Sequence, residues 1–262
     1  MKEGEASMTA RRVAAQRLSF PRLATPYGRP DADQQLQADV AGDLHVPETT
    51  MTRYLRARTA FFDRVVVDSI GAGVNQVVVL GAGYDGRSLR YAKPGVRWFE
   101  LDHPDTQADK RSRLQRLKIS CAEVGFADVT FGLGDVAAAL RQVGHDPRQA
   151  TLFACEGVAA YLRIDALTTM LTSIAGAAGP ASALAISISL QTETSAEAAR
   201  RSLLKAAVAS MGEPLVSAIP RGELGAFLAA AGWTLRRATD PAGVDIGESA
   251  RSAAFVLADP TA

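Results

Sequence analysis

Residues 76–86 read QVVVLGAGYDG, a short apolar run followed at once by three glycines in the spacing G-x-G-x-x-G. Val and Leu dominate the first five residues, as in a strand that is buried on both faces, and helical composition resumes at Arg87. Gly81, Gly83 and Gly86 therefore predict a tight strand-to-helix turn whose backbone a ligand can approach closely. By itself the motif is also explained by a turn that needs glycine for positive φ.

Strands and helices alternate on the C-terminal side of this turn. Further strands are expected at 96–101, 128–133, 151–155, 183–190, 234–238 and 253–258, and helices at 107–117, 136–143, 164–175, 191–212 and 221–231. Such alternation predicts an α/β fold, namely a Rossmann-like, mostly parallel sheet of seven strands flanked by helices.

The N-terminal region differs from this pattern. Helical composition over 9–18 and 34–40 is separated by a stretch rich in Pro and Gly, and a long amphipathic helix is expected over 51–70. We therefore expect a helical cap at 1–50 and one ligand-binding domain at 51–262.

The overall composition favours a small-molecule partner. The 29 basic and 28 acidic residues nearly cancel, so nucleic acid and membrane are not expected as partners. With two cysteines and no long apolar run, we expect a reduced, cytoplasmic protein. The three histidines and two cysteines are scattered without ligand spacing, so no metal site is expected.

Acidic residues follow several of the expected strands. Glu100 and Asp102 end the second, Asp135 follows the third and Glu156 follows the fourth. The carboxyl ends of parallel strands form the ligand crevice, where carboxylates accept protons from a ribose diol, an adenine amino group or an ammonium group. Asp102 is the expected ribose ligand, whereas Glu100 is equally explained by an ion pair with a nearby Arg. S-adenosylmethionine has all three groups and no phosphate.

Several blocks of the sequence resemble a known family, the leucine carboxyl methyltransferase-like group of class I S-adenosylmethionine-dependent methyltransferases. The resemblance is in particular to its bacterial, polyketide O-methyltransferase-type members. The blocks that carry the resemblance are RARTAFFD (56–63), QVVVLGAGYDGRSLRY (76–91), FELDHP (99–104) with Lys110 downstream, GD (134–135) and CEGVAAYL (155–162). TARRVAAQR (9–17) is a weaker version of the family's opening helix. Tyr84 and Gly86 depart from the family, which often has Thr or a small aliphatic residue there.

The resemblance implies roles for individual residues. Arg58 would hold the carboxylate of the methionyl group and Glu156 would lie by its amino group, Asp135 with Val136 would meet adenine, and Tyr161 would face the transferred methyl group or the substrate. The full cofactor set is Arg58, Gly81, Ala82, Gly83, Tyr84, Glu100, Asp102, His103, Asp135, Val136, Glu156 and Gly157. Tyr161 and Arg58 are the catalytic candidates, and the substrate candidates from the cap and the following helix are Arg17, Tyr27, His45 and Tyr54.

Methyl transfer is an in-line displacement in which positioning supplies much of the catalysis. A carboxylate acceptor is already ionised at pH 7, whereas a phenol would gain from a base, for which His45, His103 and His145 are the available imidazoles. We therefore expect an O-methyltransferase that forms a methyl ester on a small, polyketide-like carboxylic acid in secondary metabolism and releases S-adenosylhomocysteine. A phenol acceptor and a homodimer stay open.

Two other functions also stay open. One is a protein of this fold that binds S-adenosylmethionine without methylating, as a cyclase or binding module. The other, weaker alternative is an NAD(P)-dependent oxidoreductase, although no Tyr-x-x-x-Lys pair or evident catalytic His supports it.

Overall fold

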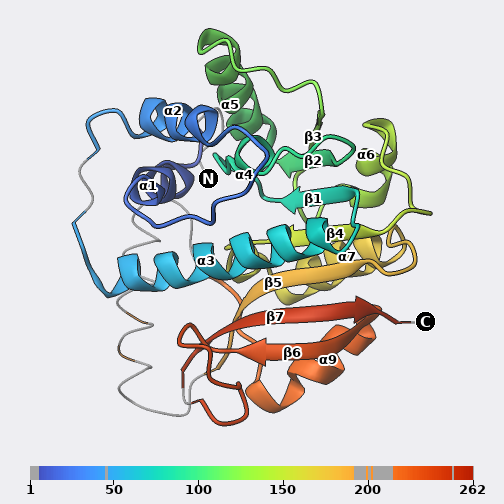
Figure 1. Cartoon of the computed structure of the whole chain (residues 1–262). Coiled ribbons are helices and arrows are strands. Elements are labelled where there is room, and N and C mark those ends of the chain that lie inside the picture. The colour runs from blue at the N-terminus through green and yellow to red at the C-terminus, as the bar shows by residue number, and fades with distance from the viewer. Residues whose placement is uncertain are drawn as a thin grey trace.

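A computed structural model describes residues 6–44, 47–191, 199, 202, 215–249 and 251–261. Its centre is one sheet of seven strands in the order β3-β2-β1-β4-β5-β7-β6 (Figure 1). The strands are β1 (Gln76–Leu80), β2 (Arg97–Asp102), β3 (Val124–Asp128), β4 (Thr151–Cys155), β5 (Ala183–Ser189), β6 (Trp233–Thr239) and β7 (Ala253–Pro260). The first five are parallel, and β7 runs antiparallel between β5 and β6. The expected α/β fold with a mostly parallel sheet is confirmed.

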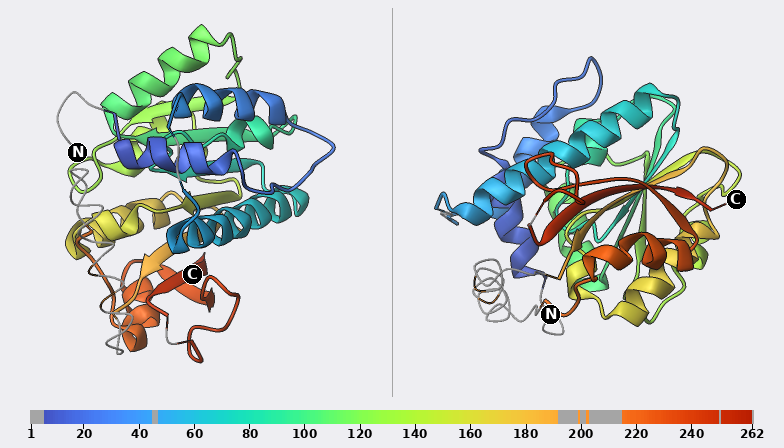
Figure 2. Two further views of the ribbon diagram at one scale, coloured as in Figure 1. Left: turned by 90° about the vertical axis from the view of Figure 1, so that its left-hand side faces the viewer. Right: turned by 90° about the horizontal axis from the view of Figure 1, so that it is seen from below.

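Helices cover both faces of the sheet (Figures 1 and 2). They are α1 (Met8–Arg17), α2 (Pro30–Ala41), α3 (Thr50–Gly71), α4 (Arg87–Arg90), α5 (Pro104–Arg116), α6 (Val136–Gln142), α7 (Ile164–Ala175) and α9 (Leu224–Ala230), with short 3-10 turns η1 (Ala159–Tyr161) and η2 (Arg221–Glu223). The helix expected over 191–212 lies almost wholly outside the described residues.

Alternation along the strands divides the core in two. Val78 and Leu80 of β1 pack on the side of α6, α7 and α9, whereas Val77 and Val79 pack on the side of α3. Successive side chains of a strand point to opposite faces, so an uninterrupted apolar strand such as β1 supplies both halves of the core.

The expected position of the third strand was wrong. We placed it at 128–133, but β3 ends at Asp128, and residues 130–134 form a turn in which the Thr130 carbonyl accepts from the N–H groups of Leu133 and Gly134. Gly132 has φ of 89°, a conformation that ends a strand. The carboxylate at the end of β3 is therefore Asp128, which lies in register beside Asp102.

The first two helices lie against the glycine-rich turn. Gln37 of α2 donates through Nε2 to the Tyr84 carbonyl at 2.6 Å. An added Cβ on Gly83 would lie 3.0 Å from the Cβ of Ala10 in α1. The N-terminal helices thus cover the carboxyl edge of β1, while the division into a cap and a domain at residue 50 stays a prediction. Among the described residues, no helix is both long and apolar enough to cross a membrane.

Candidate active site

The turn after β1 brings backbone to the edge of the sheet. Gly81 and Gly83 have φ of 65° and 50°, and the N–H groups of Gly81 and Ala82 both donate to the Leu101 carbonyl, at 2.8 and 3.1 Å. A Cβ on Gly81 would lie 2.1 Å from Cγ2 of Val158. Glycine is therefore required here by both φ and space, and the turn is held between the ends of β2 and β4.

Asp102 lies at the end of β2 and faces this turn. Its Oδ2 accepts from the Gly83 N–H, and its Oδ1 accepts from the His103 N–H at 2.6 Å. Burial raises its pKa, although the two N–H donors favour the charged form. A carboxylate has about four lone-pair sites, so two acceptor positions remain for a ribose diol.

Glu156 follows β4 and is contacted by three arginines from three different helices. Its Oε1 lies 2.9 Å from Nη2 of Arg17 and 3.0 Å from Nε of Arg58, and its Oε2 lies 2.6 Å from Nη1 of Arg87. Burial alone would raise the pKa of Glu156, but the three guanidinium groups hold it well below its usual value. Glu156 is therefore ionised despite its burial.

Arg58 comes from the N-terminal half of α3 and lies over the turn after β4. Its guanidinium lies 5.6 Å from the ring centroid of Tyr54, and a Cβ on Gly157 would come within 2.7 Å of its Nη1. Burial would lower the pKa of Arg58, but Glu156 and the nearby Tyr54 and Tyr161 raise it overall. Gly157 is thus the residue that admits the Arg58 guanidinium beside Glu156.

These pairs belong to a larger buried network that sequence analysis missed. Arg87 contacts Glu156, Asp85 and Asp63. Arg22 contacts both Asp63 and Asp33, and Arg90 also contacts Asp33. Its side chains are at most 10% exposed. The connected members are Arg17, Arg22, Arg58, Arg87 and Arg90 with Asp33, Asp63, Asp85 and Glu156. Five cations against four anions leave a net charge of +1.

Part of this network had a signal in the sequence. Asp85 and Arg87 flank the third glycine of the motif, and Asp63 lies in the RARTAFFD block. Arg22, the partner of Asp63, and Asp33, which Arg22 also contacts, come from the cap at distances along the chain that no local pattern encodes.

The residues at this edge fit S-adenosylmethionine. Glu156 can hold the methionyl ammonium group, Arg17 and Arg58 on the same carboxylate can hold the methionyl carboxylate, and Asp102 can hold the ribose. Arg17, which we expected at the substrate, thus lies among the cofactor candidates. Gly81 and Gly83 let the backbone approach such a ligand.

Two expected cofactor residues are already engaged elsewhere. Glu100 is buried and paired with Nζ of Lys110, and it accepts from Oγ of Ser88 at 2.6 Å, so the ion pair expected with an Arg is made with a Lys. The Tyr84 side chain points away from the sheet edge, into a cluster with α1, α2 and α5, where its hydroxyl contacts Asp109. Only the main chain of Tyr84 belongs to the turn.

Asp135 and Val136 lie beyond the turn that follows β3. Asp135 is the N-cap of α6, where it accepts from the Ala138 N–H at 3.1 Å, and Val136, the first residue of that helix, is buried. Because the third strand ends earlier than expected, the carboxylate at its end is Asp128, beside Asp102, and not Asp135. The buried Val129 follows it and donates through its N–H to the Asp102 carbonyl at 2.8 Å.

The aromatic candidates divide into two groups. Tyr54 and Tyr161 both lie close enough to Arg58 to raise its pKa. Tyr27 instead lies in the loop before α2, where its ring is 5.8 Å from Nζ of Lys93. The fourth substrate candidate, His45, lies outside the described residues.

The other histidines and cysteines have structural surroundings. His103 caps α5 beside Asp105 at the carboxyl edge. His145 lies near the start of β4, at the opposite end of that strand from Glu156, where it bonds Oγ1 of Thr151 at 3.0 Å and packs edge-on against Phe99. It is therefore a core residue that lies away from the site. Burial raises the pKa of the Cys155 thiol to about 12, which leaves it an inert core residue.

The described side chains include no group of three or more His, Cys, Asp or Glu that could hold a metal ion.

Comparison with known proteins agrees with this geometry. Residues 10–175 match the profile of the leucine carboxyl methyltransferase family. This chain belongs to that family. The match spans both N-terminal helices, the glycine-rich turn and Glu156, which are the parts that build the site.

Curated relatives carry the corresponding name. A protein of Mycolicibacterium smegmatis named "Putative S-adenosyl-L-methionine-dependent methyltransferase" is 32% identical over 79% of this chain and 74% of its own length. A protein of Parafrankia with the same description is 34% identical over 60% of this chain, which spans about half of that relative (51%).

Solved structures share the fold at low sequence identity. A methyltransferase-like protein from Thermobifida fusca has a TM-score of 0.61 at 15% identity, covering 100% of this chain and 97% of its own. Magnesium protoporphyrin IX methyltransferase from Synechocystis PCC 6803, crystallised with bound S-adenosylhomocysteine, has a TM-score of 0.53 at 13% identity, covering 83% of this chain and 90% of its own. The fold is that of class I methyltransferases, and S-adenosylmethionine is the cofactor of this family.

Proposed function

We propose that this protein transfers the methyl group of S-adenosylmethionine to a carboxylate oxygen of a small-molecule acid, forming a methyl ester and S-adenosylhomocysteine. The observation that carries the proposal is the buried network around Glu156, which has a net charge of +1 at the carboxyl edge of the sheet. A buried excess charge is costly unless a ligand of opposite sign compensates it.

Charge balance favours an anionic acceptor. S-adenosylmethionine has an ammonium group, a sulfonium group and a carboxylate, so it is a net monocation at neutral pH. With the cofactor bound, the network, Asp102 and the cofactor together carry about one excess positive charge. An ionised carboxylate offsets this charge, whereas a neutral phenol does not.

The chain's own residues then act by orientation and charge. Glu156, Arg17 and Arg58 fix the methionyl end, and Asp102 fixes the ribose, which together hold the sulfonium in one direction. S-adenosylmethionine held by these residues would supply an electrophilic methyl group, with the sulfur as the leaving group that keeps the electron pair of the C–S bond. The acceptor carboxylate needs no base, which agrees with a site where His145 is remote and His103 is a helix cap. Tyr161 and Tyr54, next to Arg58, are the candidates that face the acceptor.

The class of acid comes from the resemblance. Bacterial members of the polyketide O-methyltransferase type suggest a natural-product intermediate.

Calorimetric titration tests the cofactor site. We expect S-adenosylhomocysteine to bind the wild type and Asp102→Asn to bind it about 100-fold more weakly, since hydrogen bonds to a charged acceptor contribute about 1.5–3 kcal/mol each. The matched control is Asp43→Asn, which changes an exposed carboxylate in the loop after α2. NAD should give no signal. Tight NAD binding, or equal losses in both variants, would contradict the assignment.

Transfer of labelled methyl to carboxylic acids and phenols tests the reaction. An ester releases labelled methanol in alkali, whereas a phenol ether does not, so the product identifies the acceptor group. Cofactor binding without transfer to any acceptor would instead support the second candidate, a cyclase or binding module that does not methylate.

A further inference from the structure

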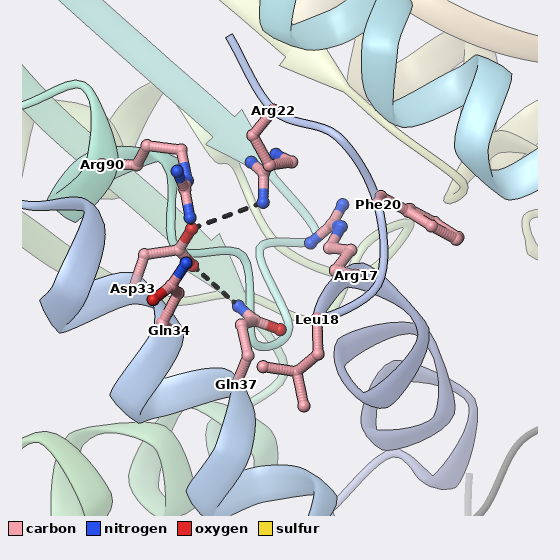
Figure 3. A pocket seen from close by; sticks show the side chains of 8 residues that line it. All are labelled: Arg17, Leu18, Phe20, Arg22, Asp33, Gln34, Gln37 and Arg90. Atoms are coloured by element: carbon pink, nitrogen blue, oxygen red, sulfur yellow. Dashed lines mark hydrogen bonds and ion pairs between the residues drawn. The ribbon is translucent and has the colours of Figure 1, made fainter. Parts of the chain in front are cut away.

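A polar pocket lies between α1 and α2, beside the glycine-rich turn (Figure 3). It has a volume of about 210 Å³, and six of its eight lining residues are polar: Arg17, Arg22, Asp33, Gln34, Gln37 and Arg90. Arg17 is shared with the cofactor edge, because its Nη2 contacts Glu156. The other polar residues come from α2, α4 and the loop between α1 and α2.

The pocket reaches the turn from the α2 side. Gln37 donates to the Tyr84 carbonyl, and a Cβ on Gly86 would lie 1.8 Å from Oδ1 of Asp33. The candidate cofactor groups instead face the side of β2 and β4, where Asp102 accepts from the Gly83 N–H and Gly81 faces Val158. The pocket is thus a neighbour of the cofactor edge and shares only Arg17 with the candidate cofactor residues.

Two buried polar atoms of the pocket residues have no hydrogen-bond partner in the described structure. Within the part of the chain that the structure describes, Nε of Arg17 and Oε1 of Gln37 are buried without a hydrogen-bond partner. Gln37 is only 2% exposed, and both of its bonds, to Asp33 and Tyr84, use Nε2. In Figure 3 its oxygen points away from Asp33, toward the side of the pocket that Arg17 and Leu18 line. A buried acceptor without a donor is costly, so a ligand that supplies one is favoured.

The charge of the lining is positive. The lining has three arginines and one carboxylate, Asp33, which is fully buried between Arg22 at 3.3 Å and Arg90 at 2.5 Å. Arg22 also pairs with Asp63 and Arg17 with Glu156, so the positive charge that remains is carried chiefly by Arg90. Arg90 bonds Asp33 through Nε, which leaves the planar fork of its terminal nitrogens at the pocket. Such a fork suits a carboxylate.

We propose that this pocket binds a carboxylate that has a hydrogen-bond donor beside it, as in a hydroxy acid. The carboxylate meets Arg90 and the Nε of Arg17, whose Nη2 stays on Glu156, and the donor meets Oε1 of Gln37. This carboxylate belongs either to the far end of the methyl acceptor or to a separate small acid. The first of these two possibilities rests on the proposed function.

The test uses glycolate as the probe, titrated by NMR or calorimetry into the full chain saturated with S-adenosylhomocysteine. The key variant is Gln34→Glu, which adds one negative charge at the pocket without changing volume. Its matched control is Gln35→Glu, the same change at the next position of α2, which is also exposed but does not line the pocket. We expect Gln34→Glu to weaken glycolate binding about tenfold and Gln35→Glu to change it less than twofold.

A second comparison tests the donor. Glycolate should bind the wild type more tightly than acetate, which has no hydroxyl group, and Gln37→Met should abolish that difference. No saturable glycolate binding, equal losses in the Gln34 and Gln35 variants, or tighter binding of inorganic phosphate than of glycolate would overturn the proposal.

The methyl-transfer assay separates the two sources. If the group belongs to the acceptor, glycolate competes with acceptor, and Gln34→Glu raises KM for dicarboxylic acids more than for monocarboxylic acids. If it is a separate acid, glycolate changes turnover without competing. The glycolate titration is read without any methyl transfer, and it can be repeated without S-adenosylhomocysteine. A negative result for carboxylate binding in the pocket can therefore be told apart from a negative result for methyl transfer.

Discussion

Replacing Glu156 by Gln isolates the charge at the centre of the buried network. The side chain keeps its size, but the net charge of the network rises from +1 to +2. Three guanidinium groups at 2.6–3.0 Å lose their shared carboxylate, and only Asp85 remains to compensate Arg17. Removing one partner from a buried ion pair costs about 3–5 kcal/mol, a large part of the roughly 5–15 kcal/mol by which a protein is stable.

Urea unfolding measures this loss. The matched control is Glu123→Gln, an exposed Glu before β3, for which we expect a change within about 0.5 kcal/mol. Adding Arg17→Met to Glu156→Gln removes a charge that has lost its partner. The double variant should therefore lose at least about 1 kcal/mol less than the sum of the two single losses.

The pH dependence gives a second measurement of the same charge. The pKa of Glu156 is well below its ordinary value of 4.5, so its stabilisation is complete above that value and is lost as the pH falls through the folded-state pKa. The unfolding free energy of the wild type should thus fall more steeply below about pH 4.5 than that of Glu156→Gln. Equal losses in Glu156→Gln and Glu123→Gln, strict additivity with Arg17→Met, or parallel acid slopes would refute the reasoning.

Other predictions concern the turn and the core. Gly83→Ala should destabilise the protein by more than the approximately 1–2 kcal/mol that positive φ costs, because its Cβ would also meet Ala10 at 3.0 Å. Gly95→Ala, with φ of 85° and open space around its Cβ in the described structure, should show only the backbone cost in urea unfolding, so equal losses would contradict crowding by α1. Burial lowers the pKa of His145 from 6.5 to about 4, so the unfolded chain takes up a proton in this range before the folded protein does. The unfolding free energy should thus fall as the pH is lowered from 6.5 to 4, and it should fall less steeply in His145→Gln. An NMR titration that gives His145 an ordinary pKa near 6.5 would exclude this histidine as the cause.

Sequence patterns that act over a few residues predicted much of the fold. The apolar runs at β1, β4 and β5 and the amphipathic period of α3 were located closely because burial of one or both faces fixes their spacing. The third strand was misplaced because VGFAD has only a weak apolar signal, whereas the turn DVTFGL resembles a strand in composition. Its position is fixed by pairing with β2, from Trp98–Val124 to Asp102–Asp128.

The cofactor edge was predictable where a motif and a strand end coincide, as at Gly81, Gly83, Asp102 and Glu156. Residues around it were misjudged where the partner lies far along the chain. Glu100 is neutralised by Lys110, and Tyr84 turns its ring into the cap. Arg17 reaches Glu156, which is 139 positions away in the sequence.

Local sequence patterns specified the succession of strands and helices, the glycine-rich turn and the carboxylates Asp102 and Glu156 at strand ends, since these depend on local periodicity and backbone conformation. Which charges meet depends on how the chain packs in three dimensions. Five arginines and four acids from α1, α2, α3, α4, the loops between them and the end of β4 form one buried network, and its net charge is a property of the assembled set. Electrostatic energy depends on distance and burial in space, and separation along the chain specifies neither.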